Sequence, residues 1–357
     1  MTDFEDLLTW RESSTSGDAI AAAVDAAAAA EDAALDVLAA ADRIVVTGAG
    51  SSYYLAQVVA SAARAMTHRP VIAVPLSELI LRPEGVLVAA AGAGEAAGRE
   101  PVVIISRSGS TSEAVTVAER MRAAGHPTIA VTCRGGSPLA SLADATLVSP
   151  AGDEAAIVMT SSFGSMLALL LGVVARVAGD QGLMTDLSRL SGHWSDATVA
   201  AHVGRRLGAT DWSRIVVLGG GPAFGIAAEW GLKLTETSQV PTSAYEPLEF
   251  RHGPMSVCEP GMLVVGLVGG AGVAEEVVVV EEAARLGAKT WLIAGDEIDG
   301  GTTAGELSRI AGGLRSSARL PLLLHPGHAL ALELALTRGC DPDAPRHLGQ
   351  VVILGSE

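Results

Sequence analysis

Short apolar runs followed by stretches with helical spacing recur along this chain, and the clearest is the Val-Val-Ile-Ile run at 102–105. Its residues are all β-branched, which is typical of a strand buried on both faces. A hydroxyl-rich loop follows, and the pattern then predicts a helix over 112–120. Further strands are predicted at the start of 42–53 and at 71–74, 128–132 and 145–148. Strands that alternate with helices predict an α/β fold with a parallel, doubly wound sheet.

The strand pattern occurs twice. Residues 214–221 echo residues 43–50, because each stretch joins an apolar strand to a glycine-rich turn that opens a helix. The runs at 263–268 and 289–294 likewise match the earlier runs at 102–105 and 128–132. We therefore predict two tandem doubly wound, flavodoxin-like units. The predicted segments are an N-terminal helical segment over 1–34, a first unit over 35–195 and a second unit over 196–357.

The loop at 106–111, Ser-Arg-Ser-Gly-Ser-Thr, is a candidate oxyanion site. Free backbone N–H groups and the dipole of the following helix would point at it, and the hydroxyls add donors. Gly109 would let the backbone approach a ligand closely. The alternative is an ordinary turn capped by Ser110 or Thr111, since both residue types are common caps. The second unit has Val-Gly-Gly-Ala-Gly at 268–272 in place of this loop, so the two halves differ in role.

Glycine-rich turns after strands also occur in dinucleotide-binding folds. The full G-x-G-x-x-G motif is absent at both turns, because Tyr53 and Phe224 stand where its third glycine would be. Dinucleotide binding is therefore not expected.

The composition narrows the classes of partner. The net charge of -16 argues against nucleic acid and against anionic membranes. The three cysteines are isolated, with no CxxC pair, which predicts a reducing compartment and no structural zinc. A small anionic ligand stays compatible with this charge, because local helix N-termini can hold it.

The stretch at 19–41 is rich in Ala, Val and Leu and is long enough to span a membrane. Four carboxylates interrupt it, at Asp25, Glu31, Asp32 and Asp36, and these would be costly inside a bilayer. The N-terminus is acidic, unlike that of a signal peptide. We expect a single helix over 19–41, no membrane partner and a cytoplasmic protein.

Two stretches of the second unit concentrate ionisable residues. Glu229, Lys233 and Glu236 have the spacing that places three side chains on one face of a helix. A surface ladder of salt bridges is the alternative, although the surrounding residues are small and apolar. The stretch 244–255 adds two glutamates, an arginine and His252, punctuated by Pro and Gly. A charged loop is the alternative there, but such a density of ionisable groups favours a functional site.

These motifs together resemble the SIS (sugar isomerase) family. The resemblance rests on 51–53 (Ser-Ser-Tyr), on 106–111, on the Glu229–Lys233–Glu236 set and on 249–254 (Glu-Phe-Arg-His-Gly-Pro). It covers nearly the whole chain. The arrangement is similar to the isomerase half of glucosamine-6-phosphate synthase and to stand-alone phosphosugar isomerases and deaminases, with 250–254 closer to the stand-alone enzymes.

The resemblance implies a role for each motif. Glu236 would be the base that moves a proton between C1 and C2, with Lys233 beside it. His252 would assist ring opening, and in the family it can come from the neighbouring subunit, which implies a homodimer with shared active sites. The resemblance assigns the phosphate and the remaining substrate contacts to Ser51, Ser52, Ser106, Arg107, Ser108, Thr111 and Glu249, where Arg107 replaces a glutamine of the synthase.

The resemblance also has departures. The chain starts Met-Thr-Asp, without an N-terminal Cys nucleophile or a glutaminase domain, so glutamine is not expected as a nitrogen donor within it. Gln350 stands where the synthase has a lysine that forms a Schiff base. Only Lys233 and Lys289 are present, so any Schiff base would fall to Lys233. This lowers the expectation of amination chemistry.

The predicted function is aldose–ketose isomerisation of a hexose or hexosamine phosphate, by proton transfer between C1 and C2. A carboxylate base suits this step, and the remote phosphate supplies binding energy that holds the open sugar. No metal and no organic cofactor is required. One alternative is an amino-sugar-6-phosphate deaminase that releases ammonia. A non-catalytic sugar-phosphate sensor is the other, and it is disfavoured because Glu236 and His252 are both present and no helix-turn-helix or basic arm is visible.

Overall fold

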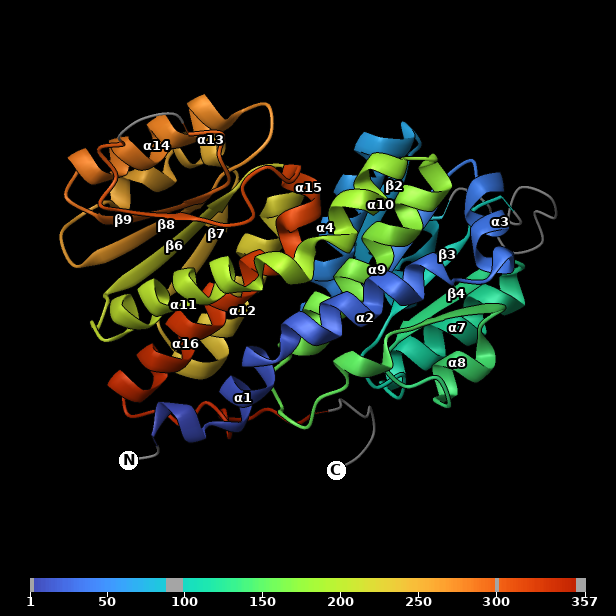
Figure 1. Cartoon of the computed structure of the whole chain (residues 1–357). Helices are drawn as coiled ribbons and strands as arrows, with labels where there is room; N and C mark the ends of the chain where they lie inside the picture. The colour runs from blue at the N-terminus through green and yellow to red at the C-terminus, as the bar shows by residue number, and fades with distance from the viewer. Residues whose placement is uncertain (1–2, 88–98, 299–301, 351–357) are drawn as a thin grey trace. The chain divides into compact units, whose positions relative to one another are not determined.

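A computed structural model describes residues 3–87, 99–298 and 302–350 of the chain (Figure 1). Its contacts group the chain into two compact units. Unit A comprises Asp18–Glu154, Ser161–Ser188 and Gly349–Glu357, and unit B comprises Met1–Gly17, Ala155–Thr160 and Arg189–Leu348. The segments predicted at 1–34, 35–195 and 196–357 stay a prediction about folding units. The two units are described separately below.

Unit A is built on a five-stranded parallel sheet with the order β2-β1-β3-β4-β5. This order confirms the predicted doubly wound, flavodoxin-like fold. The three inner strands are buried along their whole length, as apolar runs covered on both faces should be. The strands are β1 Ile44–Gly48, β2 Val71–Pro75, β3 Val102–Ile105, β4 Thr128–Thr132 and β5 Ala145–Val148.

Helices cover this sheet and confirm most of the predicted pattern. The helix predicted over 112–120 is α7, and the long apolar helix α9 is buried over most of its length. The core on the α7 side joins β3 and β4 to α5, α7 and α8. The helices are α2 Ser16–Ala28, α3 Asp32–Ala40, α4 Ser51–Thr67, α5 Leu76–Leu81, α7 Ser112–Ala124, α8 Pro138–Leu142, α9 Ser161–Ala178 and α10 Gln181–Ser188.

The single helix predicted over 19–41 is wrong, because the chain breaks between α2 and α3. Arg176 of α9 donates hydrogen bonds to the carbonyls of Ala27 and Ala30, at 3.0 and 2.7 Å. These are carbonyls at a helix C-terminus, which no longer have intrahelical partners. Glu31 is then extended, with φ -63° and ψ 144°, and α3 begins after it. A contact from a distant helix therefore ends α2.

Unit B repeats the topology of unit A, with the strand order β10-β9-β8-β6-β7. Figure 1 shows α14 on one face of this sheet, while α11, α12 and α16 form layers on the other. Its strands are β6 Arg214–Gly219, β7 Thr242–Tyr245, β8 Met262–Leu267, β9 Lys289–Ala294 and β10 Glu306–Arg309. Its helices are α1 Leu8–Ser14, α11 Trp194–Gly208, α12 Pro222–Ser238, α13 Pro247–Phe250, α14 Val273–Arg285, α15 Ser316–Arg319 and α16 Leu324–Thr337.

The two units share backbone detail at the turn after their first strand. Gly50 before α4 has φ 53° and ψ -126°, and Gly221 before α12 has φ 54° and ψ -123°. Only glycine adopts this conformation without strain. Each helix then runs for 17 residues and ends at a left-handed residue, His68 in α4 and Gln239 in α12. The predicted internal repeat is therefore present at the level of single dihedral angles.

Among the described residues, two helical stretches are long and apolar enough to cross a membrane, Ser161–Ala178 in unit A and Ser316–Thr337 in unit B. In each, 83% of the apolar window is buried inside the structure. Burial of this extent is typical of a core helix, and a core helix can be as long and as apolar as one that spans a membrane. The apolar residues of both stretches are thus accounted for by packing.

Candidate functional site

The hydroxyl loop lies between the end of β3 and the start of α7. Ser106 and Ser108 are 4% exposed, and Ser106 Oγ lies 3.4 Å from Thr111 Oγ1. Thr111 occupies the N-cap position of α7, but its side chain makes no capping hydrogen bond. A turn that used its hydroxyl only for capping would show that bond. The Thr111 hydroxyl is instead turned toward the loop, as a ligand-binding role requires.

The loop is held rigidly by its neighbours. Cys133 N–H and Thr132 Oγ1 donate to the carbonyl of Arg107, at 3.0 and 2.9 Å. Gly109 has φ 60°, and a Cβ there would clash with the Ser137 side chain. The close approach that glycine permits in this structure is to Ser137, and the expected approach to a ligand stays a prediction. These contacts fix the positions of the loop hydroxyls before anything binds.

Ser51 and Ser52 form the first turn of α4, directly after β1. Both are 5% exposed. Strand β1 pairs with β2 on one side and β3 on the other, so the sheet order reverses between β1 and β3. Ligands of doubly wound sheets bind at the carboxyl ends of the strands at this reversal. The topology thus places the Ser51–Ser52 turn and the hydroxyl loop at the same end of the same sheet.

Arg107 is buried and paired, which its sequence position did not reveal. Its Nη1 lies 3.5 Å from Oε1 of Glu154, whose side chain is fully buried. Glu154 also accepts a hydrogen bond from Ser161 N–H at 2.9 Å and one from the Ser162 hydroxyl, at the N-terminus of α9. A carboxylate is favoured there by the helix dipole. Sequence reasoning missed Glu154, because an isolated glutamate before a helix carries no distinctive motif.

Gln350 joins the chain end to this loop. Its carbonyl accepts a hydrogen bond from Arg107 Nη2 at 3.1 Å, and its Nε2 donates to the Glu154 carbonyl at 3.1 Å. The residue at the position of the family lysine is therefore a hydrogen-bonding amide beside the hydroxyl loop. An amide cannot form a Schiff base, in agreement with the expectation that no such adduct forms at this position.

In unit B, α12 carries a buried array of charges. Lys233 Nζ lies 2.7 Å from Glu236 Oε2 and 3.4 Å from Glu229 Oε1. The Glu229 and Lys233 side chains are 0% and 3% exposed, whereas that of Glu236 is 19% exposed. The surface salt-bridge ladder that we weighed is therefore wrong, and the predicted common face is confirmed. Glu236 is the member of the array that solvent or a ligand can reach.

The stretch 244–255 is more ordered than a charged loop. It contains the end of β7, the short helix α13 and the start of a 3₁₀ turn, Pro254–Val257. Glu249 and His252 are both exposed, and Arg251 pairs with Glu282 of α14. Among the described residues, no hydrogen bond or ion pair links Glu249 or His252 to the α12 array. Their predicted roles in substrate binding and ring opening stay predictions.

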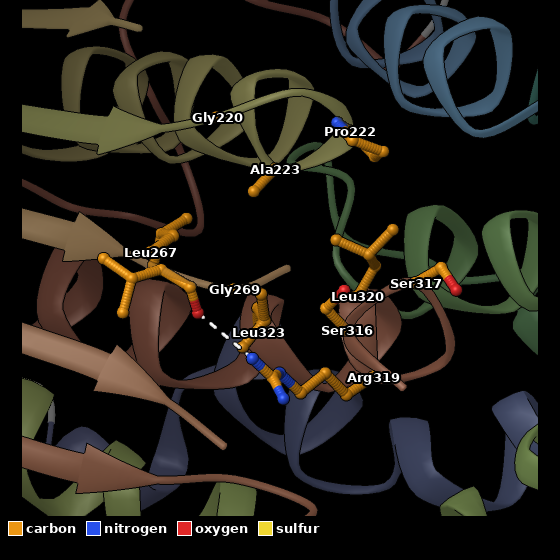
Figure 2. A pocket seen from close by; sticks show the side chains of 11 residues that line it. Gly220, Pro222, Ala223, Leu267, Gly269, Ser316, Ser317, Arg319, Leu320 and Leu323 are labelled. Atoms are coloured by element: carbon orange, nitrogen blue, oxygen red, sulfur yellow. Dashed lines mark hydrogen bonds between the residues drawn. The ribbon is translucent and has the colours of Figure 1, made fainter. Parts of the chain in front are cut away.

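Figure 2 shows the matching position in unit B, a pocket where β6 and β8 end and α12 begins. Pro222 and Ala223 stand in place of Ser51 and Ser52, so the hydroxyls of the first unit are lost. Arg319 borders this pocket and donates to the Val268 carbonyl at 3.1 Å (Figure 2).

A carboxylate of the chain itself occupies the loop amides beside this pocket. Glu276 Oε2 accepts a hydrogen bond from Gly269 N–H at 3.1 Å, and Glu246 accepts one from Gly221. Burial raises the pKa of both glutamates above the usual value. Two carboxylates of unit B therefore bind the backbone amides that an external anion would otherwise use.

Within the described part of the chain, no group of three or more His, Cys, Asp or Glu side chains is arranged to hold a metal ion.

Comparison with known proteins identifies the family. A model of the SIS domain matches residues 37–176 and 210–299. The chain belongs to the SIS family. A glutamine–fructose-6-phosphate aminotransferase of Aeropyrum pernix is 30% identical over 340 residues, which cover 89% of this chain and 52% of that protein. A D-galactosamine-6-phosphate deaminase, AgaS, of Escherichia coli O157:H7 is 29% identical over 249 residues, which cover 63% of this chain and 59% of that protein.

The solved structure of a similar protein extends the comparison to nearly the whole chain. The crystal structure of glucosamine-6-phosphate deaminase from Thermotoga maritima matches with a TM-score of 0.79 and 25% identity. The match covers 97% of this chain and 99% of that one. By contrast, the chain spans 34% to 59% of the length of the curated relatives that it matches.

Proposed function

We propose that this SIS protein is a phosphosugar isomerase that moves a proton between C1 and C2 of a hexose or hexosamine phosphate. The observation that carries the proposal is the α12 array, in which Glu236 is partly exposed while Glu229 and Lys233 are buried. Burying Glu229 and Lys233 on one helix is unfavourable unless the two groups are paired or used. Relatives named as aminotransferases and deaminases of sugar phosphates support the substrate class.

The phosphate would be held by Ser51, Ser52, Ser106, Ser108 and Thr111 of unit A. These hydroxyls lie at the reversal of the sheet order, where anions bind in folds of this type. Charge-assisted hydrogen bonds from fixed donors orient a phosphate without requiring the donors to move. Arg107 would act mainly through Glu154 and Gln350, which already engage its guanidinium.

Glu236 would take the proton from C2 of the opened sugar and return it to C1. The Lys233 ammonium, 2.7 Å away, holds the carboxylate in one orientation and lies close to charge that develops on the substrate. His252 would assist ring opening. It is exposed on its own chain, which is compatible with action at the site of a second subunit in a homodimer.

Turnover of sugar phosphates by a Glu236→Gln variant tests the proposal. The base acts only in the chemical step, so kcat should fall by on the order of 10²–10⁴ while substrate binding is nearly unchanged. Glu259→Gln, at an exposed loop position, is the matched control and should keep wild-type kcat. Solvent deuterium exchange at C2 should fall in parallel. Wild-type exchange in Glu236→Gln would place the base elsewhere, with Glu249 as the next candidate.

The role of His252 is tested by comparing cyclic and open-chain substrates. His252→Asn should slow turnover of a cyclic sugar phosphate more than that of an open-chain analogue, because only the cyclic form requires ring opening. Equal loss on both substrates would remove His252 from ring opening.

The second candidate function is deamination of an amino-sugar-6-phosphate. It is favoured by the likeness to AgaS and to the Thermotoga maritima structure, both named as deaminases. Isomerisation and deamination share the proton transfer assigned to Glu236, so the site serves either reaction. A panel of hexose and hexosamine phosphates, assayed for both ketose and ammonia, separates them. Ammonia release from an amino sugar establishes deamination, and ketose formation without ammonia establishes isomerisation.

A further inference from the structure

Contacts around the Arg107 guanidinium join the three segments of which unit A is made. Arg107 lies in the first segment, and its Nη1 is 3.5 Å from Oε1 of Glu154, the residue that ends this segment. Glu154 accepts a hydrogen bond at 2.9 Å from the N–H of Ser161, the first residue of the second segment. Arg107 Nη2 donates at 3.1 Å to the carbonyl of Gln350, in the third segment. One side chain of the hydroxyl loop therefore connects the segments of its unit.

Ser106 and Arg107 are adjacent in this loop but direct their side chains toward different helices. Ile104 of β3 packs in the core that includes α7, and residues two positions apart on a strand share a face. Ser106 continues this alternation, because its Oγ lies 3.4 Å from Oγ1 of Thr111 at the N-cap of α7. Arg107 points instead to Glu154, which bonds to the start of α9. The guanidinium therefore leaves the loop in a different direction from the Ser106 hydroxyl.

Gln350 is held through both its backbone and its side chain. Its carbonyl accepts the hydrogen bond from Arg107, and its Nε2 donates to the Glu154 carbonyl at 3.1 Å. The Arg107 and Glu154 side chains are 5% and 0% exposed, so their ion pair is shielded from water. A phosphate that bound this guanidinium would have to compete with the Glu154 carboxylate and displace the Gln350 carbonyl. Breaking a buried ion pair in this way is costly.

We propose that Arg107 is a clamp for Gln350 and not a ligand of the phosphate. Glu154 fixes the guanidinium, and the guanidinium fixes the Gln350 carbonyl. An arginine in an anion-binding loop would ordinarily be assigned to the anion, because its fork of donors matches a phosphate. Here the donors of the fork already bind a carboxylate and a carbonyl of the protein. The clamp does not depend on the function proposed above, whereas the statement about the phosphate rests on it.

The clamp is tested by NMR on protein whose glutamine side chains carry ¹⁵N. The chain has four glutamines and no asparagine, so the wild type gives four side-chain amide signal pairs. The Gln350 pair is identified by its loss in Gln350→Glu. We expect this amide to be rigid on the nanosecond timescale and slow to exchange with solvent, in contrast to that of the exposed Gln181. A Gln350 amide as mobile as that of Gln181 would overturn the clamp, and this measurement needs only the wild type and the assignment variant.

Removing the two charges should loosen Gln350. Arg107→Met/Glu154→Gln replaces both ionised side chains with uncharged ones of similar length, so no buried charge is left unpaired. Exchange of the Gln350 amide should become on the order of 10-fold faster or more, the value of one hydrogen bond to a charged group. The matched control is Arg134→Met/Asp153→Asn, which removes an exposed ion pair 3.0 Å long from the same unit. An unchanged Gln350 amide in the first variant, or equal changes in both variants, would contradict the clamp.

Calorimetry with inorganic phosphate tests whether Arg107 binds the anion. Arg107→Met/Glu154→Gln should bind phosphate nearly as tightly as the wild type, because Thr132 and Cys133 still hold the loop backbone. A guanidinium that bound the phosphate would contribute about 10- to 100-fold in affinity, so a loss of this size would overturn the assignment. Lack of phosphate binding by the wild type would instead contradict the phosphate site of the proposed function. The Gln350 signals would still decide whether the clamp exists.

Discussion

Replacing Lys233 with methionine tests whether the α12 array is a buried ion network. Methionine keeps the length of the side chain and removes its charge. Glu229, which is fully buried, then loses the ammonium that lies 3.4 Å from its carboxylate. Glu236 loses a partner at 2.7 Å, but it is 19% exposed and retains access to water. The loss of stability should therefore come mainly from Glu229.

The expected magnitude follows from this geometry. Two unit charges 3.4 Å apart interact by about 5 kcal/mol at an effective dielectric constant of about 20. Removing one partner of a buried pair typically costs about 3–5 kcal/mol, because the remaining charge is uncompensated. We expect a loss in this range at pH 7 for Lys233→Met. The loss should shrink at lower pH, where Glu229 of the variant takes up a proton.

The chain provides a matched control. Lys289 is its only other lysine, and its Nζ lies 3.3 Å from Glu306 at a site where the side chains are 39% and 27% exposed. Lys289→Met removes an ion pair of similar length from the surface, where such pairs contribute about 0–1 kcal/mol. The double variant Lys233→Met/Glu229→Gln should recover most of the lost stability, because it leaves no buried charge at Glu229.

Urea unfolding followed by tryptophan fluorescence measures these differences in the free energy of unfolding for unit B. All five tryptophans belong to unit B, so their fluorescence reports on the unit that carries α12. A chain with two compact units need not unfold in one transition, and this probe isolates the relevant one. If Lys233→Met loses no more stability than Lys289→Met, the array is not a buried ion network and our reasoning about its function fails.

Two further substitutions and one trapping experiment test other parts of the site. Ser108→Ala should weaken sugar-phosphate binding by about 1–3 kcal/mol, the value of one or two hydrogen bonds to a charged group. Calorimetry measures this loss, and Ser110→Ala, at an exposed position, is the control. Unchanged affinity would remove Ser108 from the phosphate site. Borohydride trapping with substrate should give no adduct by mass spectrometry, and an adduct on Lys233 would show that it acts as a nucleophile. Glu154→Gln should destabilise unit A by about 3 kcal/mol, because Arg107 stays charged and buried without its partner. Unfolding of unit A would be followed by far-UV circular dichroism, as a transition that tryptophan fluorescence does not report. An unchanged transition would contradict the pairing of Arg107 with Glu154.

The parts of the fold that the sequence predicted are those set by local pattern. Strands β3 and β4 have the predicted bounds, because an apolar run covered on both faces can hardly be anything else in an alternating α/β chain. The helical spacing of Glu229, Lys233 and Glu236 also predicted their common face. Their burial was not predictable from spacing, because it depends on the helices that pack against α12.

The features that the sequence did not predict depend on distant contacts. Arg176 ends α2 from a helix almost 150 positions along the chain, and no local signal marks that break. Glu154 gains its role by pairing with Arg107 and by bonding to the start of α9. The Ser13 hydroxyl contacts the rings of His325 and His328, which lie more than 300 positions away in the sequence. Single-sequence patterns report local preference, so pairings of this kind are invisible to them.

The internal repeat places different residue types at equivalent positions of one backbone. Helices α4 and α12 have equal length and the same entry and exit conformations, so Val58 and Ala62 of α4 are the counterparts of Glu229 and Lys233 of α12. In unit A these positions are 0% and 1% exposed and simply fill the core.

In unit B the same interior positions carry charge. A buried ion pair is often no more stabilising than well-packed apolar residues, and the counterparts in α4 show that such residues fit this helix. Stability alone therefore does not explain the charges of α12. The carboxyl ends of the two sheets also differ in residue type. Unit A presents hydroxyls where unit B has Pro222 and Ala223, and in unit B Glu276 accepts a hydrogen bond from a nearby loop amide. Under the proposed function, unit A would hold the anion and unit B would transfer the proton.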